Sequence, residues 1–422
     1  MTLPPAGKHE QSATSRSLSN PASFESMWAD LADVGRSPAK GGYRRFAFTP
    51  EDGQLREWFE QEAALRGLDL TTDRAGNLWA WWGDPDSDGP GIVAGSHLDS
   101  VPEGGAFDGP LGVVSAFAAI DLLNLQGYTP NRPIGVACFG DEEGARFGVA
   151  CTGSRLLTGA LDPDKARGLT DNDGMSYADA MAWAGRTPHL LAPDPQAMAR
   201  IGTFVELHME QGRGLIEVDA PVGVASEIWP HGRYRFSFSG RADHAGTTLM
   251  ADRADPMLTY AMTALAANKQ ARNRNARATF GRISVQPNGT NAIPSLVTAW
   301  LDARAENPGD LEEMLNEVAR QATERAERDG TAFDVAVESW GDLVTFDVAL
   351  RDRLATVLGG APVLSTAAGH DAGVLSAAGI PTAMLFVRNP TGISHSPDEF
   401  AELGDCAAGV RALADVLRDL AT

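Results

Sequence analysis

The 422-residue sequence predicts an α/β protein with a central mixed sheet, into which a smaller α+β domain is inserted. The chain is too long for one typical domain. Apolar runs of strand type alternate with helical patterns over much of its first half. Between about residues 225 and 340 the pattern becomes strand, helix, strand, strand, helix, strand, the order of the ferredoxin-like motif. We therefore expect residues 1–224 and 341–422 to form one domain and residues 225–340 the other.

The larger domain is predicted to begin with a helix and a hairpin. Thr49, Pro50 and Asp52 form an N-cap signature for a helix that runs to Leu65. The following segment, AGNLWAWWGDPDSDGPGIVAG, has two strand-type runs around a cluster of turn residues at positions 84–90. This pattern predicts that the two runs pair as a hairpin.

Further along the chain, imidazoles and carboxylates follow the ends of predicted strands. One group follows the apolar run IVA at positions 92–94, and a second follows the run IGVACF at positions 134–139. A third follows the alternating segment TFVEL, and one aspartate precedes an apolar helix that begins at Pro110. Ligands bind at the carboxyl ends of the strands in open α/β sheets. The residues in these positions are His97, Asp99, Asp108, Glu142, Glu143 and His208.

His395 is the last residue of this kind. It lies in the loop after the predicted strand PTAMLFV, and Ser396 with Glu399 three residues on resembles a capping box. We therefore expect a helix to begin just after His395, and a last apolar helix near residues 407–420.

These residue types are those of a catalytic metal site. Carboxylates and imidazoles without cysteine suit Zn²⁺ or Mn²⁺ in a catalytic site, and do not suit a structural four-cysteine site. A bridging carboxylate lets two metal ions lie about 3.5–4 Å apart. Five ligands would leave one glutamate to act as general base and then as general acid. Asp99, on the same side of an extended segment as His97, would orient that imidazole.

Each candidate also has a structural interpretation. A histidine taken alone is more often a hydrogen-bonded structural residue than a ligand, and Asp-rich loops are usually solvated turns. Several such residues, each directly after a strand or at a helix start, are harder to explain in this way. We therefore favour the metal-site interpretation of the whole set.

The amino-acid composition of the chain restricts the kinds of molecule that it is expected to bind. The chain has 35 Lys and Arg against 56 Asp and Glu, a net charge of −21, which argues against nucleic acid or an anionic membrane surface. Three cysteines without pairing or metal-type spacing suggest free thiols in a reducing compartment. The first twenty or so residues have no apolar signal region, and we expect them to be loosely ordered. We expect a cytoplasmic protein.

Eight motifs spread over residues 90 to 400 are similar to those of the M20 metallohydrolases: GSHLDSVPEGGAFDGPLGV, DEEGARFG, ELHMEQG, GRADHAGTT, PNGTNAIP, LDAR, GHDAG and GISHSPDE. ELHMEQG and HAGTT resemble the amidase branch of that family, which contains N-carbamoyl-L-amino acid hydrolases, allantoate amidohydrolases and β-ureidopropionases. Sequences called allantoate amidohydrolase are the most similar of these. The resemblance implies a zinc-peptidase-like catalytic domain and an inserted ferredoxin-like lid, through which the chain would form a homodimer.

The resemblance also implies a role for each candidate residue. Two divalent ions per subunit, Zn²⁺ or Mn²⁺ with Co²⁺ or Ni²⁺ also compatible, would be held by Asp108 as the bridge and by His97, Glu143, His208 and His395. The catalytic groups would be Glu142 as general base and acid, His244 at the oxyanion, and Asp99. The substrate contacts would be Gln211, Asn291, Arg304 and His370.

Two residues of the inserted domain keep a structural alternative. Arg304 suits a substrate carboxylate because a guanidinium can make two parallel hydrogen bonds to it, but it could instead pair with Asp302 or Glu306. The segment EIWPHGRYRF departs from the Gly-Gln-Arg type of turn in relatives and places His231 at the entrance to the domain. A structural role is the simpler interpretation of His231, although a residue at this position could also influence which substrate the protein prefers.

The sequence therefore predicts a dinuclear metal-dependent amidohydrolase that cleaves the linear C–N bond of a small ureido or carbamoyl acid and releases ammonia and CO₂. One alternative is an aminoacylase or dipeptidase of the same family; His208 with Gln211 favours the amidase. The other is a non-catalytic dimeric binding protein. The intact Glu142 argues against it, because a binding protein has no need of a spare base.

Overall fold

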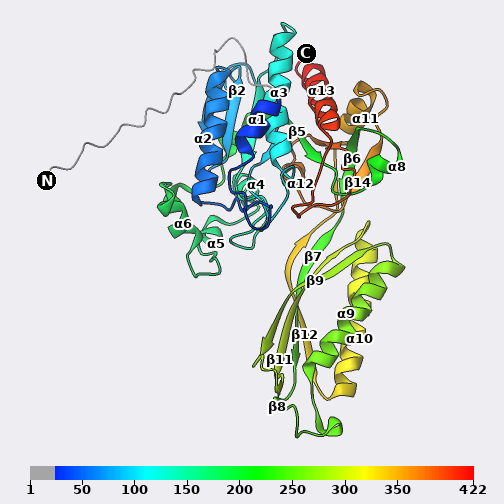
Figure 1. Ribbon diagram of the computed structural model, residues 1–422. Helices are drawn as coiled ribbons and strands as arrows, with labels where there is room; N and C mark the ends of the chain where they lie inside the picture. Colours follow the sequence, from blue (N-terminus) through cyan, green and yellow to red (C-terminus); the bar gives the residue numbers. More distant parts are fainter. Residues whose placement is uncertain (1–23) are drawn as a thin grey trace, which may run out of the picture. The chain divides into compact units, whose positions relative to one another are not determined.

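The computed structural model describes residues 24–422, so the predicted loose N-terminal segment lies outside the described residues. The chain forms two compact units, which we call the first and the second unit (Figure 1). The first runs up to Met209 and includes Ile393–Thr422, and the second is Glu210–Gly392. The inserted domain predicted at residues 225–340 lies within the second unit, and its boundaries stay a prediction.

Five strands of the first unit lie side by side in the order β1-β2-β4-β3-β5. β3 pairs in parallel with β4 on one side and with β5 on the other, whereas β2 is antiparallel to β1 and β4. The predicted hairpin of β2 and β3 is therefore wrong, because β4 lies between these two strands. The strands are β1 (Asp69–Thr72), β2 (Leu78–Trp82), β3 (Gly91–His97), β4 (Ile134–Phe139) and β5 (Ile201–Met209).

Helix α3 (Pro110–Leu125) is the central helix of the first unit. It is buried along most of its length and packs against β3, β4 and β5, as well as α1 and α13. α2 (Pro50–Leu65) begins as predicted, since the Thr49 side chain accepts a hydrogen bond from the amide of Asp52. The other helices of the unit are α1 (Phe24–Leu31), α4 (Thr152–Thr158), α5 (Pro163–Arg167), α6 (Tyr177–Trp183), α7 (Pro195–Ala199), α13 (Leu403–Leu420) and the 3₁₀ helix η1 (Pro188–Leu190).

No helix begins directly after His395. The chain between β15 (Thr382–Val387) and α13 is irregular, and α13 begins only at Leu403. The predicted capping box is therefore wrong: the Glu399 carboxylate hydrogen-bonds to the backbone of another loop, at Phe107 and Asp108. The last apolar helix predicted near residues 407–420 is confirmed.

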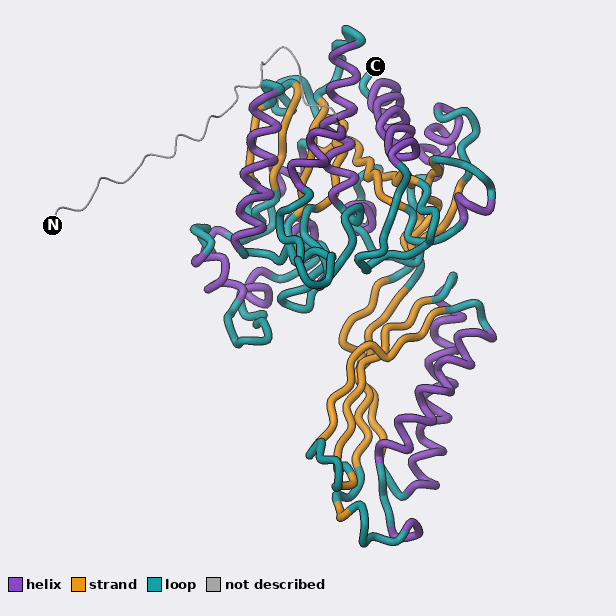
Figure 2. The backbone as a smooth tube through the Cα atoms, viewed as in Figure 1, coloured by secondary structure: helices purple, strands orange, loops and turns teal. Residues whose placement is uncertain are grey.

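The second unit contains a four-stranded antiparallel sheet in the order β12-β7-β11-β9. Its chain order, β7-α9-β9-β11-α10-β12, confirms the ferredoxin-like motif. Two helices pack side by side over one face of this sheet (Figure 2), and the core between them holds Phe236, Phe238, Leu301 and Met314. The elements are β7 (His231–Ser239), α9 (Pro256–Asn273), β9 (Arg277–Gln286), β11 (Leu296–Arg304), α10 (Pro308–Asp329) and β12 (Ala332–Gly341).

The rest of the second unit consists of short elements and a second set of strands. β6 pairs with β13 and β15 in antiparallel fashion and with β14 in parallel. β8 (Asp243–His244) and β10 (Ala292–Ile293) pair as a small ribbon. The remaining elements are β6 (Val222–Ile228), β13 (Val344–Thr345), β14 (Val363–Thr366), β15 (Thr382–Val387), α8 (Gly214–Glu217), α11 (Val348–Val357), α12 (Asp371–Ala377) and the 3₁₀ helix η2 (Met250–Asp252). Among the described residues, no helix is both long and apolar enough to cross a membrane.

The close approach of β3 and β4 makes Gly95 a critical position. A Cβ atom at Gly95 would lie 2.1 Å from the backbone oxygen of Ala137. We expect Gly95→Ala to lower the free energy of unfolding by about 3 kcal/mol, because backbone must move to accept the methyl group.

Gly53, in the first turns of α2, has no atom within 4 Å of such a Cβ. Gly53→Ala should therefore raise that free energy by about 0.5 kcal/mol. Chemical denaturation of both variants checks this, and equal effects would contradict it.

Candidate metal centre

Three parallel strands of the first unit deliver side chains to one place. His97 is the last residue of β3, and His208 is the last but one of β5. Glu142 and Glu143 follow the end of β4 by three and four residues. Because the parallel strands β4, β3 and β5 end at the same edge, these four side chains converge, as the sequence predicts.

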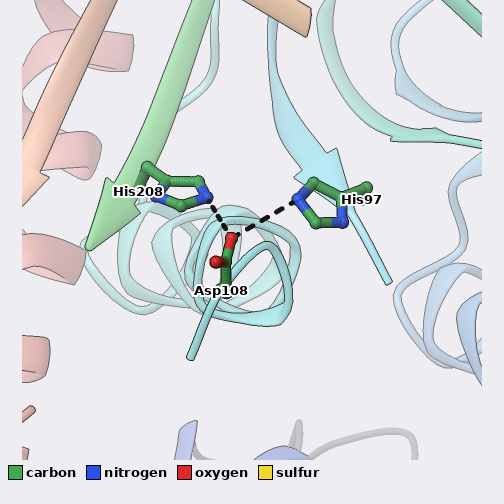
Figure 3. Close-up of side chains that lie close together, drawn as sticks. All are labelled: His97, Asp108 and His208. Carbon is green, nitrogen blue, oxygen red and sulfur yellow. Dashed lines mark ion pairs between the residues drawn. The ribbon is translucent and has the colours of Figure 1, made fainter. Parts of the chain in front are cut away.

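Asp108 faces both imidazoles from the amino end of α3. Its Oδ1 lies 3.1 Å from His208 Nε2 and 3.8 Å from His97 Nε2. Figure 3 shows the two rings at the ends of their strands, turned toward this carboxylate. The three side chains are buried and could together hold one metal ion.

The second oxygen of Asp108 faces a different pair of residues. Oδ2 lies 3.3 Å from His395 Nε2, and that same nitrogen lies 3.6 Å from Glu143 Oε1. Asp108, Glu143 and His395 form a second group that could hold a metal ion. The first group and this one share Asp108 and no other residue.

Asp99 holds the two strand ends together. Its carboxylate accepts hydrogen bonds from the backbone amides of Glu142 (3.1 Å) and Glu143 (3.0 Å). Its Oδ1 also lies 3.4 Å from His97 Nδ1. His97 Nε2 is thereby left on the side of Asp108. The orientation of His97 by Asp99 was predicted from sequence, but the contact of Asp99 with the Glu142–Glu143 loop was not.

Glu142 lies at the edge of the first group. Its Oε2 is 3.7 Å from His97 Nε2, and its Oε1 accepts a hydrogen bond from the Cys151 thiol at 3.3 Å. The carboxylate is buried and adjoins the candidate ligands without being part of either metal-ligand group.

Gly109 leaves the space that His97 needs. Its φ is +84°, and a Cβ atom there would lie between 2.4 and 2.6 Å from three atoms of the His97 ring. Any other residue would strain the backbone and displace this imidazole. Gly109 therefore allows the His97 ring to occupy its position in the site.

The electrostatics of these groups favour positive charge. Burial tends to lower the pKa of His97, but the carboxylates of Glu142 and Asp99 raise it well above its usual value. Burial likewise opposes protonation of His395, yet Asp108 and Glu143 raise its pKa to about 9. The pKa of Glu143 is raised to about 7, first by burial and then by the charge of Asp108. Imidazoles and carboxylates that bind protons this strongly are suited to bind a metal cation in place of those protons.

The donor set fits a divalent metal. Carboxylate and imidazole ligands without cysteine are those of catalytic Zn²⁺ and Mn²⁺ sites. Among the described residues, Glu143 Oε1 is a buried oxygen without a hydrogen-bond partner, an arrangement that costs free energy unless a cation is bound. The residues present therefore fit the metal that the sequence motifs imply.

The other predicted residues lie in the second unit. His244 in β8 lies opposite Ala292 of β10, next to Asn291, whose carbonyl accepts from the amide of Ala245. The ring Nδ1 of His244 lies 3.0 Å from the amide of Gly246 and 3.2 Å from that of Thr247. Because both amides donate to Nδ1, the neutral ring carries its proton on Nε2.

Arg304 forms the ion pair that was the alternative to substrate binding. Its Nε and Nη2 donate to Asp302 at 2.8 and 3.1 Å, and its Nη1 donates to the carbonyl of Ala367 at 2.6 Å. This carbonyl belongs to the loop that leads to His370, the buried residue directly before α12.

His231 and Gln211 are the remaining candidates of the second unit. His231 pairs with Arg304 in the register of β7 and β11, and its Nδ1 lies 3.2 Å from the carbonyl of Trp229. These backbone contacts agree with a structural role for His231. Gln211 follows β5 by two residues.

Sequence reasoning missed three residues at the first-unit site. Cys151, Ser394 and Glu399 contact Glu142 or Asp108, or the backbone that carries Asp108. The sequence pattern around Glu399 predicts a helix cap instead. Its true partners, at Phe107 and Asp108, lie almost 300 positions away in the chain, so no local pattern indicates them. The position of Glu399, four residues after His395, was the one available signal.

Several known proteins are similar to this chain in sequence and in fold. An N-carbamoyl-L-amino acid amidohydrolase of Geobacillus stearothermophilus is 36% identical, over 94% of this chain and 98% of its own. An allantoate amidohydrolase of Escherichia coli is 32% identical, over 93% of this chain and 96% of its own. The crystal structure of an amidase of the hydantoinase/carbamoylase family from Burkholderia vietnamiensis matches 94% of this chain and 96% of its own, at 29% identity with a TM-score of 0.85.

Residues 93–419 match the sequence pattern of the family described as Peptidase family M20/M25/M40. This match covers more than three quarters of the chain and includes every candidate ligand. The named relatives are amidohydrolases and an amidase, in agreement with the ELHMEQG and HAGTT motifs. The chain therefore belongs to Peptidase family M20/M25/M40 and, within it, to the amidase branch.

Proposed function

We propose that this protein is a dinuclear metal-dependent amidohydrolase that cleaves the linear C–N bond of a small ureido or carbamoyl acid, with release of ammonia and CO₂. One observation carries the proposal: the two oxygens of Asp108 face two separate groups of metal-type ligands. The names of the relatives, an N-carbamoyl-L-amino acid amidohydrolase and an allantoate amidohydrolase, support the substrate class.

In this proposal His97 and His208 would hold one ion, Glu143 and His395 the other, and Asp108 both. When bound, two such ions supply Lewis acidity to a substrate carbonyl and make a water molecule easier to deprotonate. The ligand set is compatible with Zn²⁺, Mn²⁺, Co²⁺ or Ni²⁺, since availability in the cell decides as much as geometry.

Glu142 is the proposed general base and general acid. Its carboxylate adjoins His97 and belongs to neither ligand group, which supports a role in proton exchange for this residue. It would take a proton from the attacking water and then donate it to the departing nitrogen. Asp99 keeps Glu142 and His97 in place through the loop amides and the imidazole that it contacts.

His244 and Arg304 are the proposed substrate groups of the second unit. The Nε2–H of His244 would donate to the oxygen that becomes negative as the carbonyl is attacked. Arg304 would bind the substrate carboxylate, together with Asn291. Its two N–H groups that face Asp302 are already paired, so the substrate would have to use its remaining donors or replace this pair. Gln211 would contact the ureido end, and His370 would lie close to the substrate.

We also propose that the chain forms a homodimer through the ferredoxin-like part of the second unit, which would act as a lid. Helix α9 exposes three apolar side chains with spacings of four and three residues, so they share one face. They are Leu258, Met262 and Leu265, with exposed fractions of 45%, 45% and 66%. An apolar face of this kind on a helix is typical of a protein interface.

The substrate assay is the first test. We expect the metal-stripped protein to be inactive and to release ammonia once Mn²⁺ or Zn²⁺ is restored. Allantoate, N-carbamoyl-L-amino acids and N-carbamoyl-β-alanine would be compared side by side, because the identities of 36% and 32% do not decide between them.

N-acetyl amino acids and dipeptides serve as the comparison. If only these were cleaved, the aminoacylase or dipeptidase alternative would replace the proposal. If the protein bound substrate without any turnover, it would be a binding protein.

The role of Glu142 predicts the behaviour of Glu142→Gln. The amide keeps the shape of the side chain but cannot accept and return a proton, so we expect kcat to fall by a factor of about 10² to 10⁴. The metal content, measured by mass spectrometry, should stay that of the unchanged protein because Glu142 is not a ligand. A variant that keeps its activity, or one that loses its metal, would exclude the assigned role.

The dimer is tested by Leu265→Glu. A charged side chain in the α9 face should convert the dimer to a monomer in sedimentation experiments, because burial of an unpaired charge opposes association. Leu125→Glu is the matched control, since Leu125 is 79% exposed but lies at the end of α3 in the first unit. A dimer that survives Leu265→Glu, or a monomeric unchanged protein, would contradict this interface.

A further inference from the structure

Glu399 is a buried carboxylate beside the metal centre that has no part in the mechanism above. It lies four residues after His395 and is 5% exposed. Its Oε1 accepts hydrogen bonds from the backbone amides of Phe107 at 2.8 Å and Asp108 at 3.0 Å. Hydrogen bonds from backbone amides to an ionised carboxylate are stronger than those between neutral groups. The side chain therefore fixes the backbone from which Asp108 projects.

Ser394 connects Glu399 to the Asp108 side chain. The Ser394 hydroxyl lies 3.0 Å from Asp108 Oδ2 and 3.0 Å from Glu399 Oε2. Ser394 directly precedes His395, whose backbone has a φ of +55°. A residue other than glycine keeps such a conformation only where the surrounding structure enforces it. One carboxylate thus contacts both the loop of Asp108 and the loop of His395.

Gly105 makes room for this arrangement. A Cβ atom at Gly105 would lie 2.2 to 2.4 Å from three atoms of the Glu399 side chain, including its own Cβ. The loop before α3 therefore lies directly against Glu399, and a change of either residue would move the other.

We propose that Glu399 is a positioning residue that sets Asp108 and His395 at the separation the metal centre requires. This inference rests on the proposed function, because it concerns the same metal ions. Glu399 acts through the backbone of residues 107 and 108 and through Ser394. It prepares the ligands for the metal before binding, so that less reorganisation accompanies binding.

Two variants of Glu399 test the proposal by metal affinity. The glutamine side chain of Glu399→Gln keeps an acceptor oxygen for both amides and turns an NH₂ group toward Ser394, whose hydroxyl can still donate to Asp108. Glu399→Ala removes the contacts of the Glu399 carboxylate with the Phe107 and Asp108 amides and with Ser394. We expect Glu399→Gln to keep a dissociation constant for Zn²⁺ close to that of the unchanged protein, and Glu399→Ala to raise it about 10- to 100-fold. Competition with a chromogenic chelator measures both values.

Serine variants test the same contact where folding is less at risk. Ser394→Ala removes the hydroxyl that contacts Asp108 and Glu399, and should also weaken Zn²⁺ binding. Ser396→Ala is the matched control in the same loop, because within residues 24–422 the Ser396 hydroxyl accepts a single long hydrogen bond, at 3.3 Å, from the amide of Asp398. It should leave the affinity unchanged.

Melting temperatures separate a positioning role from a purely structural one. A structural role would lower the melting temperatures of the metal-free and Zn²⁺-loaded variants equally and leave the dissociation constant unchanged, and this result would overturn the proposal. A positioning role reduces the rise in melting temperature that Zn²⁺ causes. If the unchanged protein itself bound no Zn²⁺ or Mn²⁺, the proposed function would fail instead, whatever the variants did.

Discussion

The Asp108 carboxylate lies between two sets of side chains: Oδ1 faces His97 and His208, and Oδ2 faces His395. Three imidazoles and several carboxylates lie within a few ångströms of it, most of them buried. Burying so many ionisable groups is unfavourable unless opposite charges lie close together. Nearby carboxylates raise the pKa of His97 and of His395, so a proton on either imidazole would offset part of this charge. Divalent cations could supply it in the same place.

In this fold, buried strands and neighbouring residues hold the ionisable side chains in place. Buried parallel strands β4, β3 and β5 end together and bring the candidate ligands to one edge. Neighbouring residues contact the segments that carry these side chains: Asp99 hydrogen-bonds to the Glu142–Glu143 loop and faces His97, and Glu399 hydrogen-bonds to the Asp108 loop and contacts Ser394. Gly109 and Gly105 leave space for His97 and Glu399 respectively. The reacting groups therefore have few other positions to adopt.

Local patterns in the sequence predict the strand ends well, because an apolar run followed by a polar residue marks the edge of a buried sheet. The placement of His97, Glu142, Glu143 and His208 follows from this alone. Local patterns predict the pairing between strands less well. The sequence of β2 and β3 resembles a hairpin, yet β4 lies between these two strands. Glu399 resembles a helix cap because its partners at Phe107 and Asp108 are remote in sequence. For Arg304, the pattern left two partners open, and the structure shows the pair with Asp302.

The proposed bridging of two metal ions by Asp108 can be tested by anomalous X-ray diffraction from crystals soaked in Mn²⁺ or Zn²⁺. We expect two anomalous peaks, one on each side of the Asp108 carboxylate. The first should lie among His97, His208 and Asp108, and the second among Glu143, His395 and Asp108. A single peak at full metal occupancy, or peaks remote from Asp108, would contradict it.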